Sequence, residues 1–481
     1  MFFVRRRRSG ASVRPARRLV WLGGLLLGTL TGCAAVRVDK AAQASTGLAS
    51  LMVCSSTFVE HQDPATAFTE RVQALRGMGL VNWGLRYQVN TEAKDVTSSV
   101  AGMFERRAVF RDGVGCVVQR EGEVLEAVGP LPADAPGPVL LADIAGPEAV
   151  TTAHAPLQAA IDLAFTEPDL PAWHRTRAVL VMRDGMVLAE RYAEGYGVAT
   201  PLSGQSMSKS LTHALVGVLV QQGRLQLHAP APVREWADPS DPRHAITLDH
   251  LLRHTSGLDL KQDNSGFDAN TQILFNARDK AAASAAAPLA APPGTRWNYT
   301  DTNYLLLSRI VRETVGGKPA DVVAFARREL LDPLGMRHVT MEFDAAGTPM
   351  GANGFYAPAR DWARLGQLYL DDGVAGGRRL LPAGWVAEAS RPSLEGYGQG
   401  AGFWTNRAKG NVPGWGVPWS MARVPADAIF ARGFMGQYTV VVPSQRLVIV
   451  RLSRSNVMGD DLAGTNDLVG NILDAMPPAS P

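Results

Sequence analysis

The chain has 481 residues, and its 48 basic and 45 acidic side chains give a formal net charge of +3. The first 32 residues hold seven Arg and no acidic residue, so the remainder carries 41 basic against 45 acidic side chains, a net charge of −4. This distribution gives no support to nucleic-acid binding, and apolar and charged fractions of 46% and 19% exclude a mostly disordered chain. The length is enough for two or three domains with a large core.

Residues 1–32 have the composition of an export signal. A run of Arg is followed by an apolar segment over residues 19–30, which is too short to cross a membrane. The segment ends in Leu-Thr-Gly-Cys33, which resembles a bacterial lipobox, and by this resemblance Cys33 would carry a lipid and begin the mature protein. Ala34, rather than Asp, follows the cysteine and favours an outer-membrane anchor that faces the periplasm. A plain secretory signal with a chance Cys33 is the alternative.

Residues 33–47 are small and polar and are predicted to form a tether from the lipid. Residues 48–128 are predicted to form a small N-terminal α+β subdomain, helical at first and rich in strands afterwards. This subdomain contains Cys54 and Cys116. In an oxidising periplasm the even pair predicts a disulfide, which would close a loop of about sixty residues. Two buried free thiols are the alternative.

Residues 129–155 are rich in Pro, Gly and Ala and are the best candidate for a linker. Beyond them, an Asp-Gly185 turn joins two apolar runs as a predicted hairpin, and residues 439–452 are predicted to form a second hairpin. Strands at both ends with helices between them predict an antiparallel sheet with a helical insertion. We therefore assign residues 156–478 to one domain.

A helix is predicted directly after Ser206, because apolar residues recur at the spacing of one helical face as far as Gly223, which ends it. Ser206 and Lys209 are three residues apart at its start, so they lie one turn from each other on one face. A serine becomes a nucleophile when a base takes its proton, and a lysine whose pKa is depressed by burial can be that base. The N–H groups of the helix start suit a developing oxyanion. The alternative is an exposed lysine after an unrelated serine, since this pair occurs by chance about once in such a chain.

Residues 251–258 read Leu-Leu-Arg-His-Thr-Ser-Gly-Leu. Together with the Ser-x-x-Lys pair, this segment resembles the class C β-lactamase and esterase superfamily of penicillin-recognising serine hydrolases. His250 and His254 are four residues apart and could form a metal pair, but no third ligand is placed nearby. We therefore predict no metal site and a structural, hydrogen-bonded His254.

The second motif implied by this resemblance is Tyr-x-Asn, and Tyr299-Thr300-Asp301 occupies its place. A tyrosine beside Lys209 can share the proton relay between Ser206 and the leaving group. The carboxylate of Asp301 can orient Lys209, although it would also raise the pKa of the lysine. Whether Lys209 or Tyr299 is the primary base therefore stays open. A core tyrosine followed by a turn aspartate is the alternative.

The third motif of the family is usually Lys-Thr-Gly or His-x-Gly, and here Phe434 stands in the place of the cation. By the resemblance, Gly436 would let the backbone approach the substrate, and the N–H of Gln437 would pair with that of Ser206 as an oxyanion hole. In penicillin-binding relatives the missing cation helps to bind the substrate carboxylate. Arg432 lies two residues away on the same strand face and is the candidate substitute.

The resemblance covers about residues 155–475 and is closest to the branch that contains 6-aminohexanoate-dimer hydrolase and carboxylesterases. It implies an α/β (α+β) fold of the β-lactamase/transpeptidase type, with a five-stranded antiparallel sheet flanked by helices and an all-α lobe. The implied reaction is cleavage of an ester or amide bond through an acyl-enzyme on Ser206, with no metal or organic cofactor.

Two rival functions are open at this point. One is a D,D-peptidase or class C-like β-lactamase that acts on cell-wall peptides or β-lactams. The other is a non-catalytic, lipid-anchored binding protein of the same fold. The expected partners are a small ester or amide substrate and, through the lipid, a membrane. The sequence indicates neither the physiological substrate nor the oligomeric state.

Overall fold

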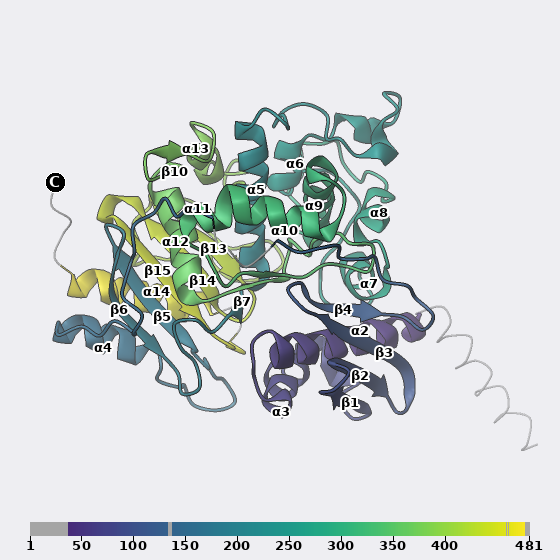
Figure 1. Cartoon of the computed structure of the whole chain (residues 1–481), viewed down its shortest axis with the longest axis horizontal. Coiled ribbons are helices and arrows are strands. Elements are labelled where there is room, and N and C mark those ends of the chain that lie inside the picture. The colour runs from purple at the N-terminus through teal and green to yellow at the C-terminus, as the bar shows by residue number, and fades with distance from the viewer. Residues whose placement is uncertain (1–36, 133–136, 458, 460, 477–481) are drawn as a thin grey trace, which may run out of the picture.

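The computed structural model describes residues 37–132, 137–457, 459 and 461–476 (Figure 1). The predicted export signal and Cys33 lie outside these residues. The described chain forms a small N-terminal unit and a larger unit, which contains a sheet and a helical lobe. Within that part of the chain, no helix combines the length and the hydropathy needed to span a bilayer.

The N-terminal unit is a long helix packed on a four-stranded antiparallel sheet, at the lower right of Figure 1. The strands neighbour one another in chain order: β1 (Leu85–Asn90), β2 (Asp95–Val100), β3 (Met103–Arg111) and β4 (Gly115–Gln119). The helical segments are α2 (Val38–Phe58), α3 (Pro64–Phe68), a π-helical turn (Thr69–Gln73) and a 3₁₀ turn (Arg76–Leu80).

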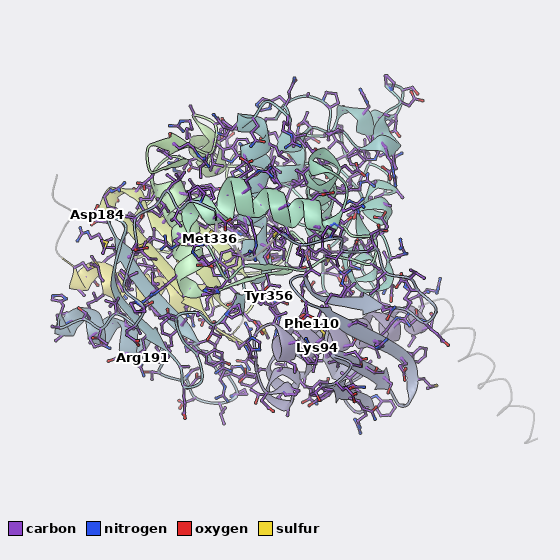
Figure 2. The ribbon with its side chains drawn as sticks, viewed as in Figure 1. Lys94, Phe110, Asp184, Arg191, Met336 and Tyr356 are labelled. Atoms are coloured by element: carbon purple, nitrogen blue, oxygen red, sulfur yellow. A yellow bond between two sulfur atoms is a disulfide. The ribbon has the colours of Figure 1, made fainter. Side chains whose placement is uncertain are left out.

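Helix and sheet of this unit are joined covalently and by aromatic packing. Cys54 of α2 and Cys116 of β4 form a disulfide, which is the predicted pairing. Phe110 of β3 packs on Phe58 of α2 with ring centroids 5.7 Å apart. Lys94 lies over the Phe110 ring, 5.3 Å from its centroid, and both residues are labelled in Figure 2.

The prediction of a tether over residues 33–47 is wrong from Val38 onward, because α2 begins there. The small, polar residues of this stretch serve helix packing instead. The Ser45 hydroxyl donates to the Ala41 carbonyl 2.9 Å away, so the polar group is satisfied within the helix. A Cβ at position 47 would lie 3.2 Å from a backbone oxygen of the larger unit, so the glycine allows close approach.

The larger unit is built on a six-stranded antiparallel sheet. In spatial order its strands are β12 (Trp404–Thr405), β13 (Ile429–Gly433), β14 (Gln437–Val442), β15 (Leu447–Leu452), β5 (Ala178–Arg183) and β6 (Met186–Tyr192). The predicted five strands are present, and the two-residue β12 adds a sixth at one edge. Helix α12 (Ala359–Leu370) covers one face, and α4 (Ala155–Leu163) and α14 (Leu462–Ala475) cover the other (Figure 1).

The helical lobe lies beside this sheet, in the upper right of Figure 1. Its helices and those near the sheet edge are α5 (Ser208–Gln221), α6 (Leu248–Leu252), α7 (Ala269–Asn276), α8 (Lys280–Ala285), α9 (Asp301–Val315), α10 (Pro319–Ala326), α11 (Asp332–Leu334) and α13 (Trp385–Ser390). Short strands form two further sheets: β7 (Leu202–Ser203), β9 (Phe355–Ala357) and β8 (Thr340–Met341) in one, β10 (Val374–Ala375) and β11 (Arg378–Arg379) in the other.

The described residues of the predicted linker, 129–155, contain no regular element before α4 begins at Ala155. The segment is nevertheless bound along its length to the larger unit. Ile144 accepts a backbone hydrogen bond from Val187 of β6 at 2.9 Å, and Leu140 donates one to the carbonyl of Pro333 at 2.7 Å. It is therefore part of the surface of the larger unit.

Candidate active site

Ser206 lies in a 3₁₀ turn, Gln205–Met207, that leads directly into α5. Gln205 has a φ of 47°, a left-handed conformation that costs a non-glycine residue about 1 kcal/mol or more and marks functional sites. Ser203 stabilises this conformation, because its hydroxyl accepts hydrogen bonds from the Gln205 backbone N–H and from the Gln205 side-chain amide. The serine is therefore presented on a strained, tightly held turn at a helix N-terminus.

Lys209 lies one turn along α5 and is almost fully buried, with 3% of its surface exposed. Its Nζ lies 3.1 Å from the Ser206 Oγ and 3.0 Å from the Ala352 carbonyl oxygen, and it also contacts the Asp301 carboxylate. These three acceptors match the three donors of a protonated ammonium. Burial acts to lower the pKa of Lys209, but the Asp301 carboxylate and the Tyr299 hydroxyl outweigh it and raise the pKa above its usual value.

Tyr299 is the third member of the site. It is 8% exposed, and its ring centroid lies 4.9 Å from the Lys209 ammonium. Thr300, the residue after it, caps α9 by accepting a hydrogen bond from the Thr302 N–H, so the helix start fixes the backbone beside the tyrosine. The structure thus brings together the predicted Ser206, Lys209 and Tyr299.

Asp301 is the first residue of α9, where the helix dipole stabilises a carboxylate. One of its oxygens accepts a hydrogen bond from Lys209 and the other from the Asn353 side chain at 3.3 Å. Asn353 and the Ala352 carbonyl come from a loop that the sequence analysis did not include in the site. No motif in that loop distinguished it, because a backbone carbonyl leaves no trace in residue identity.

His254 is fully buried beside the tyrosine, with the two ring centroids 4.5 Å apart. Its Nδ1 accepts a hydrogen bond from the Thr300 N–H at 3.3 Å. Burial and the neighbouring Lys209 cation hold the pKa of His254 well below its usual value, so the ring is neutral. His250 caps the start of α6, so His250 and His254 have different structural roles. No cluster of three metal-binding side chains occurs in the described residues.

The third motif forms the turn of the hairpin between β13 and β14, with residues 434–436 at its tip. At Gly436 a Cβ would lie 2.3 Å from the Ser453 hydroxyl, so the missing side chain allows this turn to pack against Ser453. The glycine beside the serine turn is Gly433, where a Cβ would lie 2.2 Å from the Gly204 carbonyl oxygen. The missing side chain at position 433 thus lets β13 approach the turn that carries the nucleophile.

The predicted oxyanion donor on Gln437 conflicts with the sheet register. The Asn406 N–H donates to the Ala428 carbonyl, so the backbone polar groups of Ala428 point toward β12. The backbone polar groups point alternately to the two sides of an antiparallel strand, so those of Gly433 point to β14, where Gln437 is its partner in the register. Phe434 follows Gly433 as the first residue of the turn, directly after the position that lies against the serine turn.

Arg432, the predicted substitute cation, is only 3% exposed. Its guanidinium lies 5.0 Å from the Trp404 ring centroid and 5.7 Å from that of Trp415, and it donates to the Gly459 carbonyl at 2.7 Å. These contacts hold Arg432 among aromatic rings. Phe434, by contrast, is 43% exposed.

An aromatic cluster that the sequence analysis missed surrounds Tyr299. The Trp415 and Trp404 rings lie 5.4 and 5.8 Å from the Tyr299 ring. Trp297 extends the cluster by packing on Trp419 at 5.3 Å, and Trp297 and Trp415 are only half-buried. The density of tryptophan between residues 404 and 419 was the available signal.

Comparison with known proteins agrees with this geometry. A family model described as "Beta-lactamase" matches residues 170–473. The 6-aminohexanoate-dimer hydrolase of Paenarthrobacter ureafaciens is 29% identical over 269 residues, which cover 50% of this chain and 67% of that protein. Esterase EstB of Burkholderia gladioli is 30% identical over 184 residues, which cover 33% of this chain but only 45% of the esterase.

Two solved structures show the same fold. A putative 6-aminohexanoate-dimer hydrolase from Bacillus anthracis superposes with a TM-score of 0.51 at 19% identity, over 74% of this chain and 91% of that one. A penicillin-binding protein homologue from Caulobacter crescentus gives a TM-score of 0.52 at 18% identity, over 70% of this chain and 100% of that one. At these identities the likeness concerns the fold alone.

Proposed function

The chain belongs to the Beta-lactamase family of serine hydrolases, and from this membership we propose that it cleaves an ester or amide bond through an acyl-enzyme on Ser206. The observation that carries the proposal is the contact of Lys209 with Ser206, Asp301 and Tyr299 in a nearly dry site. A pseudoenzyme that only binds a ligand has no need of this arrangement.

Because the surroundings of Lys209 keep its proton in place, the role of base is assigned to Tyr299, which lies beside the ammonium. Ser206 Oγ attacks the carbonyl carbon and its proton passes to the Tyr299 oxygen. The tetrahedral intermediate collapses, the bond to the alcohol or amine breaks, and the leaving group takes the proton from Tyr299. Water then attacks the acyl-enzyme with the same proton transfers, and releases the acid and free Ser206.

The oxyanion is assigned to the backbone N–H groups of Ser206 and Phe434. The first belongs to the turn at the start of α5, and the second follows Gly433, which lies against the Gly204 carbonyl of that turn. Removal of one preorganised donor of this kind lowers kcat by about 10²- to 10³-fold.

A neutral, apolar substrate fits the surroundings better than a carboxylate. Phe434 and the half-buried faces of Trp415 and Trp297 offer apolar surface, whereas the guanidinium of Arg432 is held between indoles and Gly459. A substrate carboxylate would therefore not find an exposed partner in Arg432. These features support an esterase or amidase over a cell-wall peptidase.

We further infer that the protein is anchored through Cys33 to the outer membrane and faces the periplasm. The disulfide between Cys54 and Cys116 supports an oxidising compartment. Replacement of Cys33 by Ser tests this inference. Release of the protein from washed membranes and loss of lipid mass are expected, whereas unchanged membrane association would contradict it.

The test of the catalytic proposal compares the full-length protein with Ser206→Ala. Each is incubated in detergent with p-nitrophenyl butyrate and separately with benzylpenicillin, and product release and intact mass are recorded. Ester turnover that vanishes in the variant, without a lasting penicillin adduct, is expected. A stable penicillin adduct would assign the chain to the cell-wall enzymes, and no reaction with either compound would refute catalysis.

A further inference from the structure

Glu60 lies two residues beyond the end of α2, in the N-terminal unit, and is 1% exposed. One carboxylate oxygen accepts hydrogen bonds from the backbone N–H of Ser203, at 2.6 Å, and from the Arg454 guanidinium. The other accepts from Arg71 at 2.9 Å and from Ser56 at 3.0 Å. A single carboxylate of the N-terminal unit thus binds two separate segments of the larger unit.

The first of these segments leads to the nucleophile. Ser203 belongs to β7 and pairs with Tyr356 of β9, which Figure 2 labels where the two units meet. Its hydroxyl holds Gln205 in the left-handed conformation that precedes Ser206. The backbone held by Glu60 is therefore only three residues from the catalytic oxygen.

The second segment leads to the hairpin of the third motif. Arg454 directly follows Ser453, whose hydroxyl donates to the carbonyls of Met435 at 2.7 Å and Gly436 at 3.0 Å. The next residue, Ser455, donates its backbone N–H to the Met435 carbonyl at 3.0 Å. The turn that carries Phe434 is thereby fastened to the chain on both sides of Arg454.

We propose that Glu60 is a positioning residue, which holds the Ser206 turn and the Phe434 turn at the separation that the oxyanion requires. The N-terminal unit is on this basis an integral part of the active site. The inference rests on the hydrolase function proposed above, because it concerns the spacing of the two backbone donors in that reaction.

The charges around Glu60 fit such a role. Burying an ion pair contributes little to stability, since desolvation offsets the attraction, but several charge-assisted hydrogen bonds fix geometry closely. Arg71 and Arg454 supply two cations for one carboxylate. Removal of Arg454 would leave a balanced pair of Glu60 and Arg71, whereas removal of the Glu60 charge would leave two buried cations.

The test therefore uses two variants of the full-length protein, Glu60→Gln and Arg454→Met. For each, kcat and KM with p-nitrophenyl butyrate are measured, together with the inhibition constant of butylboronic acid, which forms a tetrahedral adduct on the serine. We expect kcat to fall by about 10- to 100-fold with little change in KM, because a displacement of about 1 Å in a site costs roughly 10². Boronate affinity should fall in parallel with kcat.

Asp95→Asn is the matched control, because it breaks the Arg107–Asp95 ion pair within the sheet of the N-terminal unit and touches nothing near Ser206. It should lower the melting temperature and leave kcat unchanged. If Glu60→Gln does not fold, the inference is tested by Arg454→Met alone, because that variant keeps the charges of Glu60 and Arg71 paired.

Wild-type kinetic constants in a folded Arg454→Met would overturn the inference, as would a loss of activity in Asp95→Asn of the same size. Either result would leave the hydrolase function intact. An inactive wild-type protein would refute that function itself, so the two failures are distinguishable.

Discussion

The carboxylate of Asp301 accepts a hydrogen bond from the ammonium of Lys209, and the two side chains are only 7% and 4% exposed. An ion pair with so little water around it is screened weakly, so the carboxylate strongly stabilises the charged form of Lys209. Lys209 is therefore a resident cation beside the serine. This relationship favours Tyr299 over Lys209 as the base in the reaction proposed above.

Replacement of Asp301 by Asn is expected to move the alkaline limb of kcat/KM to lower pH. The carboxylate raises the pKa of Lys209 and burial lowers it, so loss of the carboxylate leaves burial to dominate. The ammonium that supports Tyr299 is then lost at lower pH. A pH–rate profile from pH 6 to 11 checks this, with Asp259→Asn, an exposed aspartate, as the control. An unchanged or raised limb would contradict the role of Asp301.

Replacement of Tyr299 by Phe is expected to lower kcat by about 10²–10⁴, the usual contribution of a positioned acid–base group. The ring would still fill its place among the tryptophans, so the melting temperature should change little. Tyr87→Phe, in the N-terminal unit, is the control and should leave kcat unchanged. Near wild-type activity in Tyr299→Phe would return the role of base to Lys209.

Replacement of Phe434 by Ala is expected to weaken selectivity for long acyl chains. The Phe434 side chain is 43% exposed, so its removal should destabilise the fold little. It would, however, remove apolar surface on which a long acyl chain of the substrate could pack. We expect kcat/KM for p-nitrophenyl octanoate to fall about tenfold and that for the acetate to change less than twofold. Leu163→Ala, at a residue 57% exposed on α4, is the control. Equal effects on both esters would show that Phe434 does not contact the acyl chain.

The sequence predicted the parts of the site that depend on residue identity at fixed spacing. Ser206 and Lys209 are one helical turn apart, so their contact follows from the geometry of α5 alone. Tyr299 required the family resemblance, because nothing in local spacing links it to a helix ninety residues earlier. The disulfide was predicted from the oxidising compartment and from the number of cysteines, since only Cys54 and Cys116 were left to pair.

What the sequence could not provide depends on backbone register. Gly433 and Gly436 stand three residues apart, and only the contact of position 433 with the Gly204 carbonyl shows which of them lies against the serine turn. The tether prediction failed for a different reason. Small, polar residues are typical of a linker, but they also suit a helix whose face is pressed against another unit.

Replacement of Cys116 by Ser is expected to lower the free energy of unfolding by about 4 kcal/mol, the chain-entropy value for a loop of this size. The disulfide closes a separation of 62 residues and joins α2 to β4. Urea unfolding followed by circular dichroism measures the loss. Wild-type protein treated with a reductant provides the control and should match the variant. A loss below about 1 kcal/mol would show that packing of the unit suffices without the bond.

Replacement of Glu342 by Gln is expected to flatten the pH dependence of stability between pH 5 and pH 8. Burial raises the pKa of Glu342 to about 7, against the opposing hydrogen bonds from Ser55 and the Cys116 N–H. A raised carboxyl pKa means that the folded state holds a proton that the unfolded chain has lost, so this stability is complete below pH 4.5 and disappears as the pH rises through 7. The shift corresponds to roughly 3 kcal/mol, and Gln keeps the neutral shape at every pH.

The free energy of unfolding in urea, measured at pH 5 and at pH 8, should therefore differ by less in the variant than in the wild type. The control Glu121→Gln, at an exposed site, should behave as the wild type does. The same pH dependence in all three proteins would show that Glu342 is ionised in the folded state at pH 5.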